Sequence, residues 1–176
     1  MKKEVKIRTA FTDDAEQISV VQVQTWLSTY RGFIADDFLN RMNVSSSTNF
    51  WKKVINDKNN NVIVAETDKI IGYINFGKGR DKKEFVGEIY ALYVLPMNQG
   101  QGIGRLLMNE AVEILLKNGF NSLYLWVLTK NIASRKFYEM LGGEIIDVKN
   151  IEVDGKLYEH TSYGWRNLNK LIFRKD

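Results

Sequence analysis

Three glycines in five positions mark the stretch Gln99–Gly104, which lies between an apolar strand-like run and an amphipathic helix-like segment. Glycine has no Cβ atom, so the backbone N–H groups of Gly100, Gly102 and Gly104 stay accessible. Because a helix follows at once, these N–H groups add to the positive end of the helix dipole. The spacing therefore predicts a cradle for an anion, such as the phosphate of a ligand.

Three interpretations of this loop compete. A dinucleotide-binding turn requires Gly-x-Gly-x-x-Gly and an acidic residue at the end of the next strand, whereas this chain has Gly-x-Gly-x-Gly and a next strand that ends in Trp126–Thr129. A P-loop requires Gly-Lys-Ser/Thr, whereas Leu106 follows Gly104-Arg105 here. The third interpretation, an ordinary tight turn between a strand and a helix, stays open on the loop alone.

A lone carboxylate and a polar helix face also stand out. Glu88 precedes the uncharged run Ile89–Gly104, so it is the only charge that enters the central apolar strand. Further along, Asn131, Ser134 and Tyr138 recur at i, i+3 and i+7 of a predicted helix. The apolar stripe of that helix is predicted on another face, at Ala133, Phe137, Met140 and Leu141. The alternatives are a solvent-exposed carboxylate at Glu88, a plain helix cap at Asn131 and a rim aromatic at Tyr138.

The composition restricts the chemistry. The chain of 176 residues has no cysteine, which excludes disulfides, thiolate metal sites and a cysteine nucleophile. A single histidine, His160, argues against a zinc site and is given no role, so no metal is expected. Catalysis would rest on carboxylates, tyrosines, lysines and backbone dipoles.

The charge pattern and the apolar runs predict a cytoplasmic protein. The net charge of +4 suits a polyanionic ligand but is too small to indicate nucleic acid. The longest apolar run, Ala91–Met97, is far shorter than the ~20 residues of a membrane helix. The N-terminal segment carries charges where a signal peptide requires an apolar core.

Hydrophobic periodicity and turn signals predict alternating strands and helices. Strands are expected at Val5–Arg8, Val62–Glu66, Ile70–Phe76, Val86–Leu95, Leu123–Val127, Ile145–Val153 and Lys156–Tyr163, with a hairpin turn at Asp154-Gly155. Helices are expected from a capping box at Asp13 and Glu16 to a break at Arg31–Phe33, from Asp36, over Ser47–Ile55, from Ile103 to Asn118-Gly119, and from an Asn131 cap to Leu141. This order describes an α/β or α+β sheet domain with helices on both faces.

Two motifs together resemble those of the GNAT superfamily of N-acetyltransferases. Gln99, Gly102 and Gly104 match its acetyl-CoA signature Gln/Arg-x-x-Gly-x-Gly/Ala, after the strand end Leu92–Pro96. The segment Asn131–Gly143 resembles the second hallmark, although the family usually has Gly-Phe where this chain has Gly142-Gly143. Residues 26–33 (Trp-Leu-Ser-Thr-Tyr-Arg-Gly-Phe) also resemble a subgroup whose substrates are poorly defined.

The resemblance implies a fold and a reaction. The fold would be one N-acetyltransferase domain over residues 1–176, with a core of about 4–165. Its central mixed, mostly antiparallel sheet of six to seven strands would carry helices on both faces and splay at the central strand. The reaction would transfer an acetyl group from acetyl-CoA to a primary amine by direct attack in a ternary complex.

The resemblance also assigns candidate residues. Coenzyme contacts fall on Leu92, Tyr93, Val94, Gln99, Gly100, Gln101, Gly102, Ile103, Gly104, Arg105, Asn131, Ser134 and Tyr138. Tyr138 would protonate the leaving sulfur, and Glu88 would accept the amine proton, directly or through water. Trp26, Tyr30, Tyr90 and Trp126 are candidates for an acceptor pocket, since aromatic rings attract amines, although each could equally belong to the core.

Two matters stay open at this point. The acceptor could be a small amine (polyamine, amino sugar or amino acid) or an amine of a peptide or protein, and a homodimer is expected by analogy only. An acyl-CoA-binding sensor without turnover is the competing class of function, and a dinucleotide-dependent oxidoreductase is a remote third.

Overall fold

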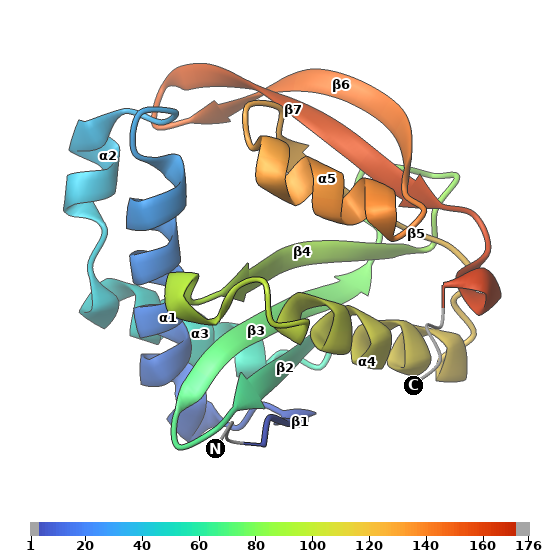
Figure 1. Ribbon diagram of the computed structural model, residues 1–176, viewed down its shortest axis with the longest axis horizontal. Coiled ribbons are helices and arrows are strands. Elements are labelled where there is room, and N and C mark those ends of the chain that lie inside the picture. The colour runs from blue at the N-terminus through green and yellow to red at the C-terminus, as the bar shows by residue number, and fades with distance from the viewer. Residues whose placement is uncertain (1–3, 172–176) are drawn as a thin grey trace. The chain divides into compact units, whose positions relative to one another are not determined.

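The computed structural model describes residues 4–171, so residues 1–3 and 172–176 at the ends of the predicted domain lie outside the described part. Figure 1 traces its elements in chain order. The strands are β1 (Lys6–Thr9), β2 (Asn60–Glu66), β3 (Ile70–Lys78), β4 (Gly87–Val94), β5 (Leu123–Leu128), β6 (Glu144–Val153) and β7 (Lys156–Trp165). The helices are α1 (Ala15–Tyr30), α2 (Asp36–Arg41), α3 (Val44–Asn56), α4 (Ile103–Lys117) and α5 (Ile132–Met140).

The strands pair in the order β1-β2-β3-β4-β5-β7-β6. The β1–β2, β2–β3, β5–β7 and β6–β7 pairs are antiparallel, and the β4–β5 pair is parallel. The predicted mixed, mostly antiparallel sheet is therefore confirmed, with seven strands among the described residues. The chain forms two compact units, and its assignment to one domain stays a prediction.

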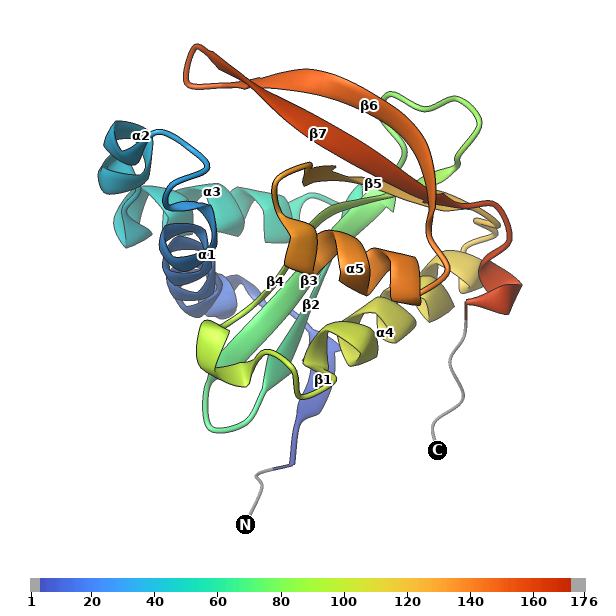
Figure 2. The same cartoon turned by 45° about the horizontal axis from the view of Figure 1, so that its top comes forward.

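The first unit contains the residues up to Gly77 together with Ala91–Ala111. Within it, β2 and β3 pair in antiparallel register, with Ile63 opposite Ile74 and Val64 opposite Tyr73. Helices α1 and α3 pack on each other, and Trp51 of α3 contacts Tyr73 edge to face at 4.8 Å between ring centroids. Figures 1 and 2 show these two helices side by side. The core of this unit therefore lies between the helix pair and the strands.

Arg8 organises the entry into α1. Its guanidinium donates two hydrogen bonds to Asp14, at 2.7 and 3.0 Å, and two to Glu66, at 3.0 and 2.7 Å. The Asp14 carboxylate also accepts the backbone N–H of Phe11, at 2.7 Å. Hydrogen bonding to Arg8 lowers the pKa of both carboxyl groups. The predicted capping box of Asp13 and Glu16 is wrong, because the neighbouring Asp14 closes this turn instead.

The other boundaries follow local signals closely. Gly32, with a φ of +83°, ends α1 within the predicted break. Helix α3 begins at Val44, ahead of the predicted start at Ser47, because the side chain of Asn43 accepts the N–H of Ser46 at 2.9 Å and caps it. Two single-turn 3-10 segments, Pro96–Asn98 and Leu168–Lys170, are too short for periodicity to reveal.

The second unit contains Lys78–Tyr90 and the residues from Val112 onward. Its parallel ladder pairs Gly87–Ile89 with Leu123–Leu125. The ladder ends there although β4 continues to Val94 and β5 to Leu128, where the resemblance places a splay. Strands β6 and β7 form the predicted hairpin, whose turn residues Asp154 and Gly155 have φ values of +53° and +73°.

Helix α5 presents a different face than its apolar pattern predicts. Figures 1 and 2 show it running alongside β6 and β7. Tyr138 and Leu141 are buried, whereas Met140 is 77% exposed and Ala133 is exposed as well. The predicted stripe that joined Ala133 and Met140 is therefore wrong. The ring of Tyr138 packs at 6.1 Å from Tyr163 and 6.3 Å from Trp165, and aromatic area outweighs the small side chains in orienting the helix.

Trp165 explains the glycine at 143, where the family usually has phenylalanine. A Cβ atom at Gly143 would lie 2.7 Å from Cζ2 of Trp165 and 2.9 Å from the carbonyl oxygen of Tyr138. The indole is 5% exposed, and its N–H donates to the carbonyl of Leu141 at 2.9 Å. The indole from β7 thus occupies the volume that a side chain at position 143 would fill.

The Gly143→Ala variant should be less stable by about 1–3 kcal/mol, because the added methyl group overpacks the indole. Chemical denaturation of the variant and the wild type measures this difference. Trp165→Phe, which shortens the ring system, serves as the partner in a double-mutant cycle, and the double variant should be more stable than the sum of the single effects. Strict additivity of the two substitutions would contradict the assigned contact.

Candidate functional site

The glycine-rich loop of the first unit has the backbone that an anion cradle requires. Gly100 and Gly102 have φ values of +71° and +82°, a region that disfavours other residues. A Cβ atom at either position would meet no heavy atom within 4 Å, so the space in front of both glycines is open. Helix α4 begins directly afterwards, and its first intrahelical bond runs from Leu106 N–H to the carbonyl of Gly102, at 3.1 Å. The preceding N–H groups lie at the positive end of the helix.

Two glutamine side chains hold the loop against the residues that precede it. Gln99 Nε2 donates to the carbonyl of Val94 at 2.9 Å, and Gln101 Nε2 donates to that of Met97 at 3.1 Å. Ile103 is 2% exposed and anchors the start of the helix in the core, whereas Arg105 is exposed. The family motif thus contains a side chain, Gln99, that shapes the loop. Its contact with a coenzyme stays a prediction.

The last residues of β4 are positioned by the neighbouring strand of the same unit. Leu95 N–H donates to the carbonyl of Ile71 at 2.8 Å. A Cβ atom at Gly72 would lie 2.9 Å from the carbonyl oxygen of Tyr93, so the close approach of these backbones depends on glycine. Leu92, Tyr93 and Val94 therefore have a fixed backbone geometry, as their predicted role requires.

Glu88 lies in the second unit as a buried and fully hydrogen-bonded carboxylate. Its Oε2 accepts from Arg80 N–H at 3.1 Å, Arg80 Nε at 3.0 Å and the Tyr124 hydroxyl at 2.7 Å. Its Oε1 accepts from Arg80 Nη2 at 2.7 Å. The side chain of Glu88 is 3% exposed, which overturns the alternative of a solvent-exposed carboxylate.

Arg80 covers this carboxylate from the solvent side. Its own side chain is 67% exposed, and its guanidinium lies 4.4 Å from the ring centre of Tyr90. Hydrogen bonding to Glu88 raises the pKa of Arg80. Three of the four hydrogen bonds to Glu88 end on Oε2 and one ends on Oε1, and Arg80 donates three of the four. Sequence spacing gave no signal for Arg80, because the contact closes a loop.

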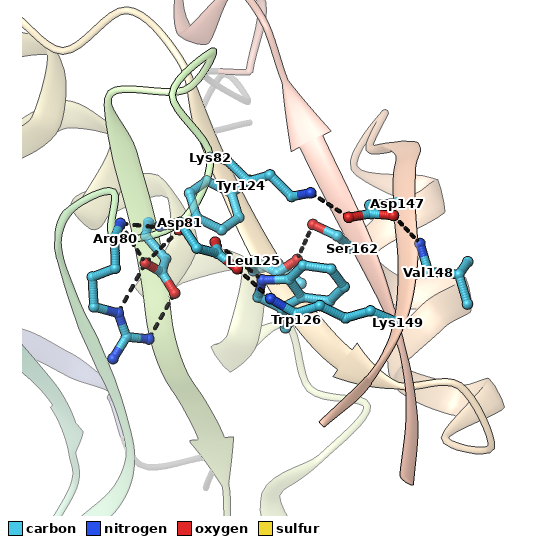
Figure 3. A network of polar contacts seen from close by, with 11 residues as sticks. Arg80, Asp81, Lys82, Tyr124, Leu125, Trp126, Asp147, Val148, Lys149 and Ser162 are labelled. Carbon is cyan, nitrogen blue, oxygen red and sulfur yellow. Dashed lines mark hydrogen bonds and ion pairs between the residues drawn. The ribbon is translucent and has the colours of Figure 1, made fainter. Parts of the chain in front are cut away.

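The rings of Trp126 and Tyr90 already make cation–π contacts with basic side chains of the protein. Figure 3 shows Lys82 and Lys149 on either side of Trp126, with Nζ atoms 5.2 and 4.1 Å from the ring centre. Lys82 pairs with Asp147 and Lys149 with Asp81. The hydroxyl of Tyr90 donates to the carbonyl of Lys78 at 2.6 Å. Their predicted role in binding an amine would require the chain's own cations to move.

Asn131, Ser134 and Tyr138 lie on the inward side of α5 in the second unit. Asn131 Oδ1 accepts the N–H of Ser134 at 3.1 Å, so Asn131 caps the helix as predicted. Asn131 is 6% and Tyr138 8% exposed, while Ser134 is half-buried. The Tyr163 hydroxyl beneath them donates to Glu139 at 2.5 Å and accepts from Arg135 at 3.0 Å. These contacts hold the ring of Tyr163, whose centroid lies 6.1 Å from that of Tyr138.

Trp26 and Tyr30 of α1 meet in the first unit, with ring centroids 4.8 Å apart. Tyr93 of β4 lies 6.4 Å from Trp26, and Tyr73 of β3 lies 5.7 Å from Tyr93. Sequence reasoning did not include Tyr73 in this group. The available signal was its central place in an apolar strand, the position that Tyr93 holds in the next strand.

Comparison with known proteins identifies the family. The model of the acetyltransferase (GNAT) family matches residues 22–142, which is more than half of the chain. YuaI of Bacillus subtilis (strain 168), named an uncharacterized N-acetyltransferase, is 34% identical over 170 residues, covering 95% of this chain and 96% of YuaI. An uncharacterized N-acetyltransferase of Archaeoglobus fulgidus is 32% identical over 139 residues, covering 76% of this chain and 89% of its own.

Solved structures agree with this result. The PaiA N-acetyltransferase of Thermoplasma acidophilum, in complex with coenzyme A, has a TM-score of 0.74 and 23% identity over 90% of this chain and 98% of that one. The yncA protein of Salmonella typhimurium, with its cofactor acetyl-CoA, has a TM-score of 0.70 and 19% identity over 98% of this chain and 96% of that one. The chain belongs to the acetyltransferase (GNAT) family and has the GNAT fold. The predicted N-acetyltransferase class is confirmed.

Residues 4–171 contain no group of histidine, cysteine, aspartate and glutamate side chains that could hold a metal ion. No helix in the same part of the chain is long and apolar enough to cross a membrane.

The Gly102→Ala variant should bind coenzyme A at least roughly tenfold more weakly, about 1.4 kcal/mol, because the methyl group enters the open space in front of the loop. Titration calorimetry with coenzyme A measures the change. Gly119→Ala is the matched control, since Gly119 has a φ of +80° and an equally open Cβ position outside this loop. Both variants should lose about 1–2 kcal/mol of stability through backbone strain. Equal coenzyme affinity in the two variants would contradict the cradle.

Proposed function

We propose that this protein is an acetyl-CoA-dependent N-acetyltransferase that acts on a primary amine by direct attack in a ternary complex. The observation that carries the proposal is the loop of Gly100 and Gly102, whose open, positive-φ backbone precedes α4 and matches the family signature. Related support comes from PaiA and yncA, which were solved with coenzyme A and acetyl-CoA. Acetyl-CoA would supply the acetyl group as a thioester.

The coenzyme would be held by backbone groups more than by side chains. The N–H groups from Gln101 to Arg105, which precede the first intrahelical bond at Leu106, suit the phosphates, with the Arg105 side chain as an added positive charge. The backbone of Leu92–Val94 would pair with the pantetheine arm. Asn131, Ser134 and Tyr138 would contact it from α5. Gly104, the second residue of α4, has no side chain that could cover these N–H groups.

Tyr138 would donate the proton that the departing sulfur requires. Its ring is buried among Phe137, Tyr163 and Trp165, and such packing limits the positions of the hydroxyl. A group that transfers a proton needs this fixed geometry before it needs a matched acidity.

Replacing Tyr138 by phenylalanine should lower kcat by roughly ten- to a thousandfold, near the usual range for general acid catalysis. The ring packing is retained, so the melting temperature should change little. Steady-state assays of thiol release, with Tyr158→Phe of β7 as the matched control, measure the effect. An unchanged kcat in Tyr138→Phe removes Tyr138 from the mechanism.

Glu88 would accept the amine proton, directly or through water. The position is buried and charged, but its four hydrogen bonds mean that the exposed Arg80 side chain must swing away first. Tyr124 remains as a donor that holds the carboxylate in place. The Arg80 side chain would therefore cover Glu88 at rest and move away before the amine proton is transferred.

The Glu88→Gln variant should lose the acidic limb of the pH–rate profile, because the amide has no proton to gain in that range. Its kcat/KM at neutral pH should fall by roughly a hundredfold or more, as for other general bases. Profiles of kcat/KM from acid to alkaline pH test both points. If Glu88→Gln keeps the wild-type acidic limb, another group is the base.

The acceptor would be a small amine or a peptide amine, and a homodimer stays an expectation by analogy. The hydrogen bonds that Arg80 and Tyr124 donate to the Glu88 carboxylate favour one competing function, an acyl-CoA-binding sensor without turnover. Thiol release from acetyl-CoA across a panel of amines, measured beside coenzyme binding, separates the two. Tight binding without release on any amine supports the sensor.

A further inference from the structure

Four aromatic side chains of the first unit form one group, termed here the Trp26 cluster: Trp26, Tyr30, Tyr73 and Tyr93. Two come from α1 and two from adjacent strands, β3 and β4. Each ring lies within 6.4 Å, centroid to centroid, of another member. Tyr93 belongs to the segment of β4 whose backbone we propose for the pantetheine arm, so the cluster adjoins that segment.

Two hydrogen-bond donors in this cluster lack partners. Among the described residues, neither the indole N–H of Trp26 nor the hydroxyl of Tyr73 makes a hydrogen bond, although both atoms are buried. Tyr73 is 0% exposed. Burial raises the pKa of Tyr73 well above its usual value, so the hydroxyl keeps its proton and stays a donor. Buried donors without partners are rare in native proteins, and they destabilise the fold.

The polar ends of the cluster influence one another. Burial is the main cause of the raised pKa of Tyr93; the neighbouring Tyr30 and Tyr73 raise it further, while Trp26, acting as a hydrogen-bond donor, lowers it. Tyr30 likewise raises the pKa of Tyr73. The Trp26 indole N–H thus lies near the Tyr93 hydroxyl, although it does not reach hydrogen-bond geometry. The Tyr73 hydroxyl has no hydrogen-bond partner among the described residues.

We propose that the Trp26 cluster binds an amine substrate that also carries an oxygen acceptor, a carboxylate or a hydroxyl group, held by Trp26 Nε1 and the Tyr73 hydroxyl. This inference rests on the proposed acetyltransferase function and narrows its acceptor class. It favours amino acids and amino sugars over polyamines.

The hydrogen-bond donors of the cluster distinguish amino acids and amino sugars from polyamines. Indole N–H groups only donate, and a protonated amine also only donates. Aromatic faces would attract a polyamine by cation–π contact, but its ammonium groups would leave Trp26 Nε1 unpaired. A site built to donate to a substrate oxygen rejects analogues that lack it, because the buried donors then stay unsatisfied.

Matched pairs of amines test this proposal. Lysine with cadaverine and phenylalanine with phenethylamine differ by a carboxylate, whereas glucosamine with cyclohexylamine differs by ring oxygen and hydroxyl groups. Thiol release from acetyl-CoA gives kcat/KM for each compound. At least one oxygen-bearing member should exceed its partner by roughly tenfold or more, and the pair concerned identifies carboxylate or hydroxyl as the acceptor.

Tyr73→Phe and Trp26→Phe remove one donor each and keep an aromatic ring. Each should lower the preference ratio of that pair by roughly tenfold, toward one. The melting temperature of Tyr73→Phe should stay equal or rise, since an unpaired buried hydroxyl is removed; a merely structural role would lower it. Tyr158→Phe, on β7 of the second unit, is the matched control and should leave the ratio unchanged.

The outcomes separate this inference from the function on which it rests. Turnover that favours cadaverine or cyclohexylamine, or a preference that survives both variants, overturns the assigned acceptor class but leaves the acetyltransferase intact. Absence of turnover on every amine counts against the proposed function. In that case, calorimetry of the same pairs with the coenzyme A-loaded protein still decides: equal binding within each pair overturns the cluster's role.

Discussion

The hydrogen bond from Gln99 to the carbonyl of Val94 determines how β4 passes into the glycine-rich loop. It joins the last residue of the strand to the first residue of the family signature, while the N–H of Leu95 is held by Ile71. The loop glycines then begin from a fixed point, and α4 starts from its anchored Ile103. These contacts of the first unit therefore fix the end of β4, the loop and the start of α4 relative to one another.

The second unit meets a different requirement, which is to keep charged and polar groups away from water. The carboxylate of Glu88 is satisfied by a loop arginine and a tyrosine from β5. The Tyr163 hydroxyl is shared between Arg135 and Glu139. Because a buried charge without partners is costly, these contacts explain how chemically useful groups persist inside a folded protein.

Local signals predicted much of this molecule. The succession of strands and helices along the chain, the hairpin at Asp154-Gly155 and the cap at Asn131 follow from short-range pattern and turn chemistry. The predictions were wrong where contacts between residues far apart in the sequence determine the structure. Which face of α5 is exposed depends on the contact of Tyr138 with Trp165, and the turn before α1 depends on the hydrogen bond from Arg8 to Asp14. The partners of Glu88 and the place of Tyr73 likewise depend on contacts between segments, which spacing along one chain does not contain.

The contact of Gly143 with Trp165 has an evolutionary consequence. Two positions that compete for one volume must vary together, since a large residue is tolerated at only one of them at a time. Among relatives, a phenylalanine after the α5 glycine should therefore accompany a small residue at the end of β7. Covariation of these two positions would then distinguish branches of the family. A chimera that takes α5 from one branch and β7 from another would combine two large residues or two small ones.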